Sequence, residues 1–192
     1  VVIVGRPNVG KSTLFNRLTR TRRALVGDEP GITRDRLLGV AEWRGHQFQL
    51  TDTGGLLPGS REEIPAAIFQ QARLALASAA VVIMLVDGRT ELAAPDLELA
   101  RLLCSSGKPV LLLVNKIESE RQAGDLGPFY RLGIRDVFPI SAEHGQGLEA
   151  ALDAVLAALE AAGEPSAEAQ GSAAAEPAQE ETRIAIVGRP NV

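Results

Sequence analysis

The sequence predicts an α/β fold: an open, six-stranded, mostly parallel sheet with one antiparallel edge strand and helices on both faces. Short runs rich in Val, Ile and Leu alternate along residues 1–162 with longer segments of helical periodicity. Four of the short runs are apolar throughout, which is typical of strands covered on both faces. Two further runs flank the turn Arg44-Gly45 and indicate a hairpin, which supplies the antiparallel strand.

The expected strands are residues 1–4, 37–43, 46–50, 81–86, 110–114 and 137–140. The expected helices are residues 11–19, 63–78, 94–105, 121–132 and 148–161. Pro65 suits a first helical turn, and Gly107-Lys108-Pro109 would stop a helix before the next strand. Ligands of such open sheets bind at the carboxyl ends of the strands, so we expect the loops after the strands to carry the chemistry.

Composition limits the class of protein. Of the 192 residues, 45% are hydrophobic and only 4% are aromatic, so we expect a core of Leu, Val, Ile and Ala. The single cysteine, Cys104, excludes an internal disulfide and fits a reducing compartment. No segment reaches the roughly 18 to 20 apolar residues of a membrane span, and no charged-then-apolar leader opens the chain. We therefore expect a soluble, cytoplasmic protein without a membrane partner.

Residues 163–182 divide the chain, because they hold five glutamates, no Lys or Arg, and almost nothing bulkier than Ala. Such a segment cannot bury enough apolar surface to offset its ordering entropy, so we interpret it as a flexible acidic linker. Residues 1–162 form the expected folded domain, whose nearly neutral charge gives no argument for nucleic acid. After the linker, IAIVGRPNV repeats the opening VVIVGRPNV at seven of nine positions. Residues 183–192 are therefore interpreted as the start of a second such domain.

The loop after the first strand, residues 5–12, reads GRPNVGKS and fits the pattern G-x-x-x-x-G-K-[ST]. Glycines let backbone N–H groups surround a phosphate, and the following helix directs its positive end there. Lys11 would neutralise the outer phosphates, and Ser12 would ligate magnesium. The pattern predicts a loop that binds a nucleoside triphosphate.

Later loops should then supply the remaining groups at the same edge of the sheet. DTGG, residues 52–55, offers the Asp52 carboxylate to the magnesium shell and the Gly55 N–H to the terminal phosphate. Thr33, in EPGITRD, would bring its hydroxyl to the metal when the loop of residues 22–35 closes. NKIE (residues 115–118) and SAEH (residues 141–144) follow the last two expected strands.

The order and spacing of these five motifs over residues 1–162 resemble those of the translation-factor-like GTPases. The resemblance implies that Asn115 bonds the guanine edge, that Lys116 lies along the base, and that the Ser141-Ala142 backbone meets the guanine carbonyl. Glu118 stands where the family usually has Asp. Glu offers the same bidentate chemistry on a longer stem, which implies a weaker preference for guanine.

The resemblance implies GTP or GDP as the ligand, with magnesium and potassium as cofactors. The residues expected at the nucleotide are Asn8, Val9, Gly10, Lys11, Ser12, Thr13, Asp52, Thr53, Gly54, Gly55, Asn115, Lys116, Glu118, Ser141 and Ala142. The expected catalytic residues are Lys11, Thr33, Asp52 and Gly55. The expected magnesium ligands are Ser12, Thr33 and Asp52, and the expected potassium ligand is Asn8.

Leu56 stands where many such GTPases carry the glutamine that orients the attacking water. Leucine cannot form a hydrogen bond, so hydrolysis should be slow without potassium or a partner. In related GTPases an Asn at the position of Asn8 holds a potassium ion, and the alternative for Asn8 is a role in bracing the loop.

Six arginines crowd into residues 17–36, and three roles remain open for them: a solvated helix end, contact with RNA phosphates, or a finger on the γ-phosphate. They are Arg17, Arg20, Arg22, Arg23, Arg34 and Arg36. His46 and His144 have no Cys or carboxylate at metal-ligand spacing, so we interpret them as a strand residue and a loop residue.

Two such domains in tandem resemble the bacterial double-GTPase family called EngA or Der, and EPGITRDR strengthens the resemblance. The family's implied role is maturation of the large ribosomal subunit. The implied partners are a guanine nucleotide, the large subunit and a second GTPase domain downstream. Two alternatives remain open: a potassium-stimulated GTPase of tRNA modification, and a nucleotide-gated binding module with negligible turnover.

Overall fold

The computed structural model describes residues 1–19, 37–53, 64–119, 124–163 and 167–168. Its strands are β1 (Val2–Val4), β2 (Leu37–Trp43), β3 (His46–Asp52), β4 (Val82–Asp87), β5 (Val110–Asn115), β6 (Asp136–Pro139) and β7 (Ala167–Glu168). Its helices are α1 (Lys11–Thr19), α2 (Ile64–Ser78), α3 (Ala94–Cys104) and α5 (Leu148–Ala161), and η1 (Gly127–Leu132) is a 3₁₀ helix.

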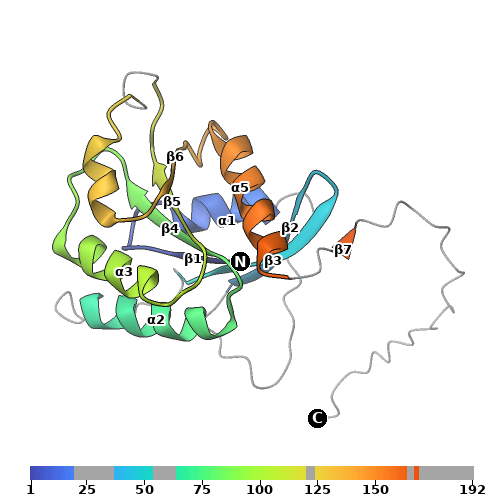
Figure 1. Cartoon of the computed structure of the whole chain (residues 1–192). Coiled ribbons are helices and arrows are strands. Elements are labelled where there is room, and N and C mark those ends of the chain that lie inside the picture. Colours follow the sequence, from blue (N-terminus) through green and yellow to red (C-terminus); the bar gives the residue numbers. More distant parts are fainter. Residues whose placement is uncertain (20–36, 54–63, 120–123, 164–166, 169–192) are drawn as a thin grey trace, which may run out of the picture.

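The sheet has the order β2-β3-β1-β4-β5-β6 (Figure 1). All neighbours along this path pair in parallel except β2 and β3, which form an antiparallel hairpin at the edge. The predicted mostly parallel sheet with one antiparallel edge strand is therefore confirmed. The short strand β7, which the sequence did not indicate, pairs antiparallel with β3 beside His46 and Gln47.

Strand side chains alternate between two hydrophobic layers. One layer joins Ile3, Ile83 and Leu113 to α1 and α5, and the other joins strand residues such as Met84 and Leu112 to α2, α3 and η1. Figure 1 shows these two groups of helices on opposite faces of the sheet. Continuous apolar strands are thus covered on both sides, as their sequence predicts.

Three strands extend beyond their predicted ends and finish on a polar residue: Asp52, Asp87 or Asn115. Hydrogen bonding to the neighbouring strands continues to these positions, because Asp52 pairs with Ile3 and Asp87 pairs with Asn115 in the sheet register. Three side chains with hydrogen-bonding capacity therefore stand at the carboxyl edge of the sheet.

The helix predicted over residues 121–132 is wrong in its described part. Residues 124–126 are not helical, and only the 3₁₀ helix η1 follows them. Gly124, Gly127 and Pro128 explain the difference, because glycine destabilises a helix interior and proline lacks an N–H donor. The remaining predicted helices begin and end within one residue of those observed, wherever the chain is described.

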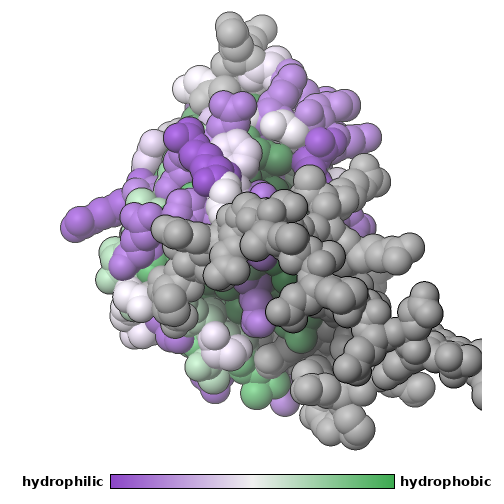
Figure 2. All heavy atoms as spheres, turned by 90° about the vertical axis from the view of Figure 1, so that its right-hand side faces the viewer, coloured by the Kyte–Doolittle hydropathy of each residue, from purple (hydrophilic) through white to green (hydrophobic). Residues whose placement is uncertain are grey.

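The described part of the surface carries few large hydrophobic side chains. Among the described residues, those that are exposed are Leu38, Leu74 and Tyr130. On the face seen in Figure 2, hydrophilic atoms gather toward the top, and hydrophobic atoms show mainly in small areas between and below them. In the described part of the chain, no helix is both long and apolar enough to span a membrane.

Candidate functional site

Lys11, the first residue of α1, folds back onto the loop between β1 and α1. Lys11 is only 7% exposed, and its Nζ donates to the carbonyls of Gly5 at 2.9 Å and Arg6 at 2.7 Å. Burial lowers the pKa of Lys11, and the negative charge of Asp52 opposes part of that shift. An ammonium has three donors, so two carbonyls leave one for a further acceptor such as a phosphate oxygen.

The same loop is anchored from α3. Arg6 Nε donates to Asp96 Oδ1 at 2.8 Å, and Asp96 is fully buried at the start of α3. The other carboxylate oxygen of Asp96 accepts the Ala93 N–H at 3.0 Å. The sequence pattern did not indicate this contact, because the two residues lie 90 positions apart.

Two oxygen ligands face each other where α1 begins and β3 ends. Ser12 Oγ donates to Asp52 Oδ2 at 2.8 Å, and Asp52 is fully buried. A hydroxyl and a carboxylate are hard oxygen donors of the kind that magnesium prefers, so this pair fits a magnesium ion. Thr53 follows Asp52, and its hydroxyl donates to the Ile3 carbonyl at 2.9 Å. Thr33, Gly54, Gly55 and Leu56 lie outside the described residues.

Asn115 joins three loops through one buried side chain. Its Nδ2 donates to the Val9 carbonyl at 2.8 Å, and its Oδ1 accepts the Ala142 N–H at 2.9 Å. The amide is 3% exposed. Gly10 lies against it, because a Cβ at Gly10 would stand 2.3 Å from Asn115 Nδ2. The predicted phosphate loop and both predicted base motifs are thereby brought together at one edge of the sheet.

Lys116 makes a second bridge between the loops. Its Nζ donates to the Asn8 carbonyl at 2.9 Å and to Asp87 Oδ2 at 2.6 Å. Both Asn8 and Lys116 have a positive φ, 66° and 69°, which marks them as two unusual backbone positions held by this contact. The side chain of Asn8 is exposed.

Asp87, at the end of β4, belongs to the same cluster. Burial by itself would raise the pKa of Asp87, but hydrogen bonds from Lys116 and the Arg89 backbone, with the charges of both residues, hold it below the ordinary value. The sequence offered a signal for this residue, since VVIMLVD ends on a polar residue just as VLLLVN does.

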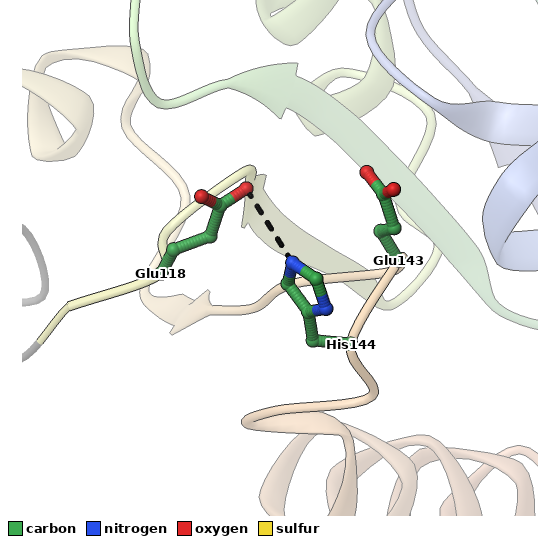
Figure 3. Close-up of side chains that lie close together, drawn as sticks. All are labelled: Glu118, Glu143 and His144. Atoms are coloured by element: carbon green, nitrogen blue, oxygen red, sulfur yellow. Dashed lines mark ion pairs between the residues drawn. The ribbon is translucent and has the colours of Figure 1, made fainter.

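Glu118 lies at the outer side of the cluster. It forms an ion pair with Arg89, and His144 Nε2 lies 3.9 Å from the same oxygen, Oε1 (Figure 3). His144 lies in a loop, as interpreted, and the fold brings it a carboxylate neighbour from another loop, which the spacing of residues in the sequence did not indicate. Glu118, Glu143 and His144 place one ligand atom each within 4.8 Å of one another, but all three are exposed and Glu118 already contacts Arg89.

The side chain of Arg17 contacts the loop that contains SAEH, residues 141–144, and is not surrounded by solvent alone. Its guanidinium, on α1, donates to the backbone carbonyls of Ala142 and Glu143. Of the open roles for the arginine cluster, the solvated helix end therefore does not describe Arg17. The other five arginines lie outside the described residues. Ser141 shapes the same loop, since its Oγ accepts the His144 N–H at 3.2 Å.

The family model of the 50S ribosome-binding GTPases matches residues 1–116. Among curated proteins, the chain is 46% identical over 192 residues to GTPase Der of Acidithiobacillus ferrooxidans, covering 100% of this chain and 41% of that protein. It is 48% identical over 194 residues to GTPase Der of Myxococcus xanthus, again with 100% and 41% coverage. The chain thus spans about two fifths of the length of these relatives.

Solved structures share the fold. Era in complex with MgGDPNP and nucleotides 1506–1542 of 16S ribosomal RNA superposes with a TM-score of 0.64 at 28% identity, covering 81% of this chain and 55% of that chain. The G domain of the T. maritima FeoB iron transporter superposes with a TM-score of 0.61 at 29% identity, covering 82% of this chain and 96% of that chain.

Proposed function

Because the chain belongs to the family of 50S ribosome-binding GTPases, we propose that it binds and hydrolyses GTP as a switch in the assembly of the large ribosomal subunit. The observation that carries the proposal is the buried side chain of Asn115, which joins the phosphate loop to both base motifs. A nucleotide bound with its phosphates at Lys11 and its base at Asn115 would lie along this joined edge. The similarity to proteins named GTPase Der supports the same role.

At the phosphate end, Lys11 would bind a phosphate oxygen with the donor that its two carbonyl contacts leave over. Ser12 and Asp52 would hold magnesium, whose charge would help to neutralise the phosphates. We assign Thr33 to the same metal, and the Gly55 N–H to the terminal phosphate. The neighbouring backbone, from Asn8 to Thr13, and the Thr53-Gly54 segment complete the proposed phosphate site.

At the base end, Asn115 and the Ser141-Ala142 backbone would bond the guanine edge, and Lys116 would lie along the ring. Glu118 would accept the ring N–H and the exocyclic amine of guanine. The solved Era complex contains MgGDPNP, and that protein's similarity supports a guanine nucleotide with magnesium here. ADP lacks both donors that Glu118 would read, so it should bind far more weakly.

Hydrolysis by the isolated chain should be slow, because Leu56 cannot orient water, and we propose that Asn8 ligates a potassium ion that speeds it. The test is phosphate release from GTP by the full chain, with magnesium, in equal concentrations of potassium and sodium chloride. We expect faster release in potassium, and an Asn8→Ala variant that has lost the difference. Equal rates in the two salts would reject the role of potassium, and undetectable release in both would favour a binding module.

The proposed domain division and the proposed ribosomal partner come from the relatives, which are longer than this chain. The alignment with GTPase Der covers the whole chain, including residues 163–182 and 183–192, and 41% of that protein. We propose that residues 1–162 are the first GTPase domain, that residues 163–182 link it onward, and that residues 183–192 begin a second. The partner would be the large ribosomal subunit, which implies the cytoplasm. Cosedimentation of the longer protein with large subunits, with GTP but not GDP, tests this role.

A further inference from the structure

The carboxylate assigned to the base, Glu118, has neighbours from two other loops. Glu118 follows β5, and its side chain is 38% exposed. Because glutamate has one more rotatable bond than aspartate, it loses more conformational freedom when it is held in one geometry. A residue that holds Glu118 in place would therefore affect how well it reads a base.

Arg89 is in a position to hold it. Its guanidinium, in the loop after β4, pairs with Glu118 Oε1, in the loop after β5. His144 Nε2 lies 3.9 Å from the same oxygen. A carboxylate offers about four acceptor positions, so it can accept donors from more than one partner at the same time.

Arg89 is itself positioned by the base cluster. Its backbone N–H donates to Asp87 Oδ1 at 2.9 Å, and Asp87 Oδ2 accepts Lys116 Nζ at 2.6 Å. Gly88 lies between Asp87 and Arg89 in the chain, and its N–H donates to the Asn115 carbonyl at 2.7 Å. The loop that carries Arg89 is thus fixed to the same two residues, Asn115 and Lys116, that are assigned to the base.

We propose that Arg89 is a specificity-determining positioning residue, which orients Glu118 so that its carboxylate reads the exocyclic amine of a purine base. The inference rests on the proposed binding of guanine nucleotides. Arg89 acts through Glu118 and does not itself contact the base. The ion pair is half exposed, since the Arg89 side chain is 50% accessible, so its effect should weaken as salt screens the two charges.

The test compares GDP with inosine diphosphate, which lacks the exocyclic amine, on the full chain with magnesium. The measured quantity is the ratio of the two dissociation constants in the wild type and in Arg89→Ala. We expect the preference for GDP to fall about fivefold in Arg89→Ala, the upper range for an exposed ion pair. Arg101→Ala, at an exposed arginine on α3, is the matched control and should leave the ratio unchanged.

A second pair of variants separates positioning from folding. In E118D the shorter side chain withdraws the carboxylate from Arg89, so adding Arg89→Ala to E118D should change the ratio by less than about twofold, which is within the scatter of such double-mutant comparisons. A ratio unchanged in Arg89→Ala alone, or an equal fall in both backgrounds, would overturn the inference. Equal weakening of GDP and inosine diphosphate, with a lower melting temperature, would also overturn it by showing a structural role. ADP serves as the reference ligand. Equal affinity of the wild type for ADP and GDP would reject the proposed function itself.

Discussion

Ser12 Oγ donates a 2.8 Å hydrogen bond to Asp52 Oδ2, so the end of the phosphate loop touches the end of β3 directly. These residues are 40 positions apart in the chain. The contact unites a predicted phosphate motif with a predicted metal ligand, and it makes the magnesium assignment testable at both residues.

Ser12→Ala should raise the magnesium concentration that GDP binding requires. Removing a hydroxyl that contacts a buried carboxylate should cost about tenfold in the magnesium concentration needed for half-maximal binding, within the range for hydrogen bonds to charged groups. Magnesium titration of GDP affinity measures this. Ser78→Ala, on α2, is the control and should match the wild type. An unchanged magnesium requirement in Ser12→Ala would reject the assignment.

Gly10→Ala should disrupt the phosphate loop and the base site together. The new Cβ would lie 2.3 Å from Asn115 Nδ2, and the φ of 102° at Gly10 already disfavours a side chain. We expect at least about tenfold weaker GDP binding, since Asn115 must move from its two partners. Binding isotherms and urea unfolding measure the two effects.

Gly107→Ala is the matched control for backbone strain. Gly107 has a φ of 72°, but nothing stands within 4 Å of its Cβ position. It should lose about 1–2 kcal/mol of unfolding free energy and keep its GDP affinity. If both variants bind GDP equally well, Gly10 does not support Asn115 in the way described.

Asp87 should contribute to stability in a pH-dependent way. Desolvation acts to raise the pKa of Asp87, but Lys116 and Arg89 outweigh it, so the folded pKa lies below the ordinary 3.8. A carboxyl group with a depressed pKa stabilises the folded state fully above about pH 5, and that contribution is lost as the pH falls through the folded pKa. The difference in unfolding free energy between the wild type and Asp87→Asn should therefore shrink as the pH falls.

Urea unfolding at pH 7 and near pH 3.5 measures that difference. Asp125→Asn, at an exposed aspartate, is the control and should stay within about 0.5 kcal/mol of the wild type at both values. A difference for Asp87→Asn that grows toward acid pH would contradict the ion pair with Lys116.

Arg17→Ala should speed the release of GDP. Arg17 donates to the carbonyls of Ala142 and Glu143, and the Ala142 N–H bonds Asn115, so the arginine steadies the loop assigned to the base. We expect about fivefold faster dissociation, and partial rescue by Arg17→Lys, which keeps the charge without the fork. Stopped-flow release of a fluorescent GDP measures the rate. Arg73→Ala, exposed on α2, is the control, and equal rates for all four proteins would contradict this role.

The sequence was sufficient for the sheet, because apolar strands and a two-residue turn determine most of its geometry. The continuous runs ending at Val86 and Val114 predicted strands covered on both faces, and both layers of core were found. The hydrophobic pattern along the chain did not predict the strand ends correctly, because pairing with neighbouring strands also determines them. The strands ended later, at Asp87 and Asn115, because pairing with the next strand continues through polar residues.

The site was predictable where one loop carries a whole motif, and not where residues meet across loops. GRPNVGKS and NKIE indicated their chemistry directly, but Arg17 and Ala142 lie 125 positions apart, and only the fold brings them together. Arg89 and Asp87 had the weakest signal, a single polar residue at the end of an apolar strand. The failed helix before η1 shows the converse, since Gly124, Gly127 and Pro128 were local warnings against it.

The most direct measurement is competitive displacement of a fluorescent GDP from the full chain, with magnesium, by GDP, ADP and xanthosine diphosphate. Xanthine replaces the exocyclic amine of guanine with a carbonyl, so it removes a donor that Glu118 is assigned to accept. GDP should displace the probe far better than either competitor. Equal displacement by ADP would show that these loops do not read guanine, and would contradict the proposed GTPase function.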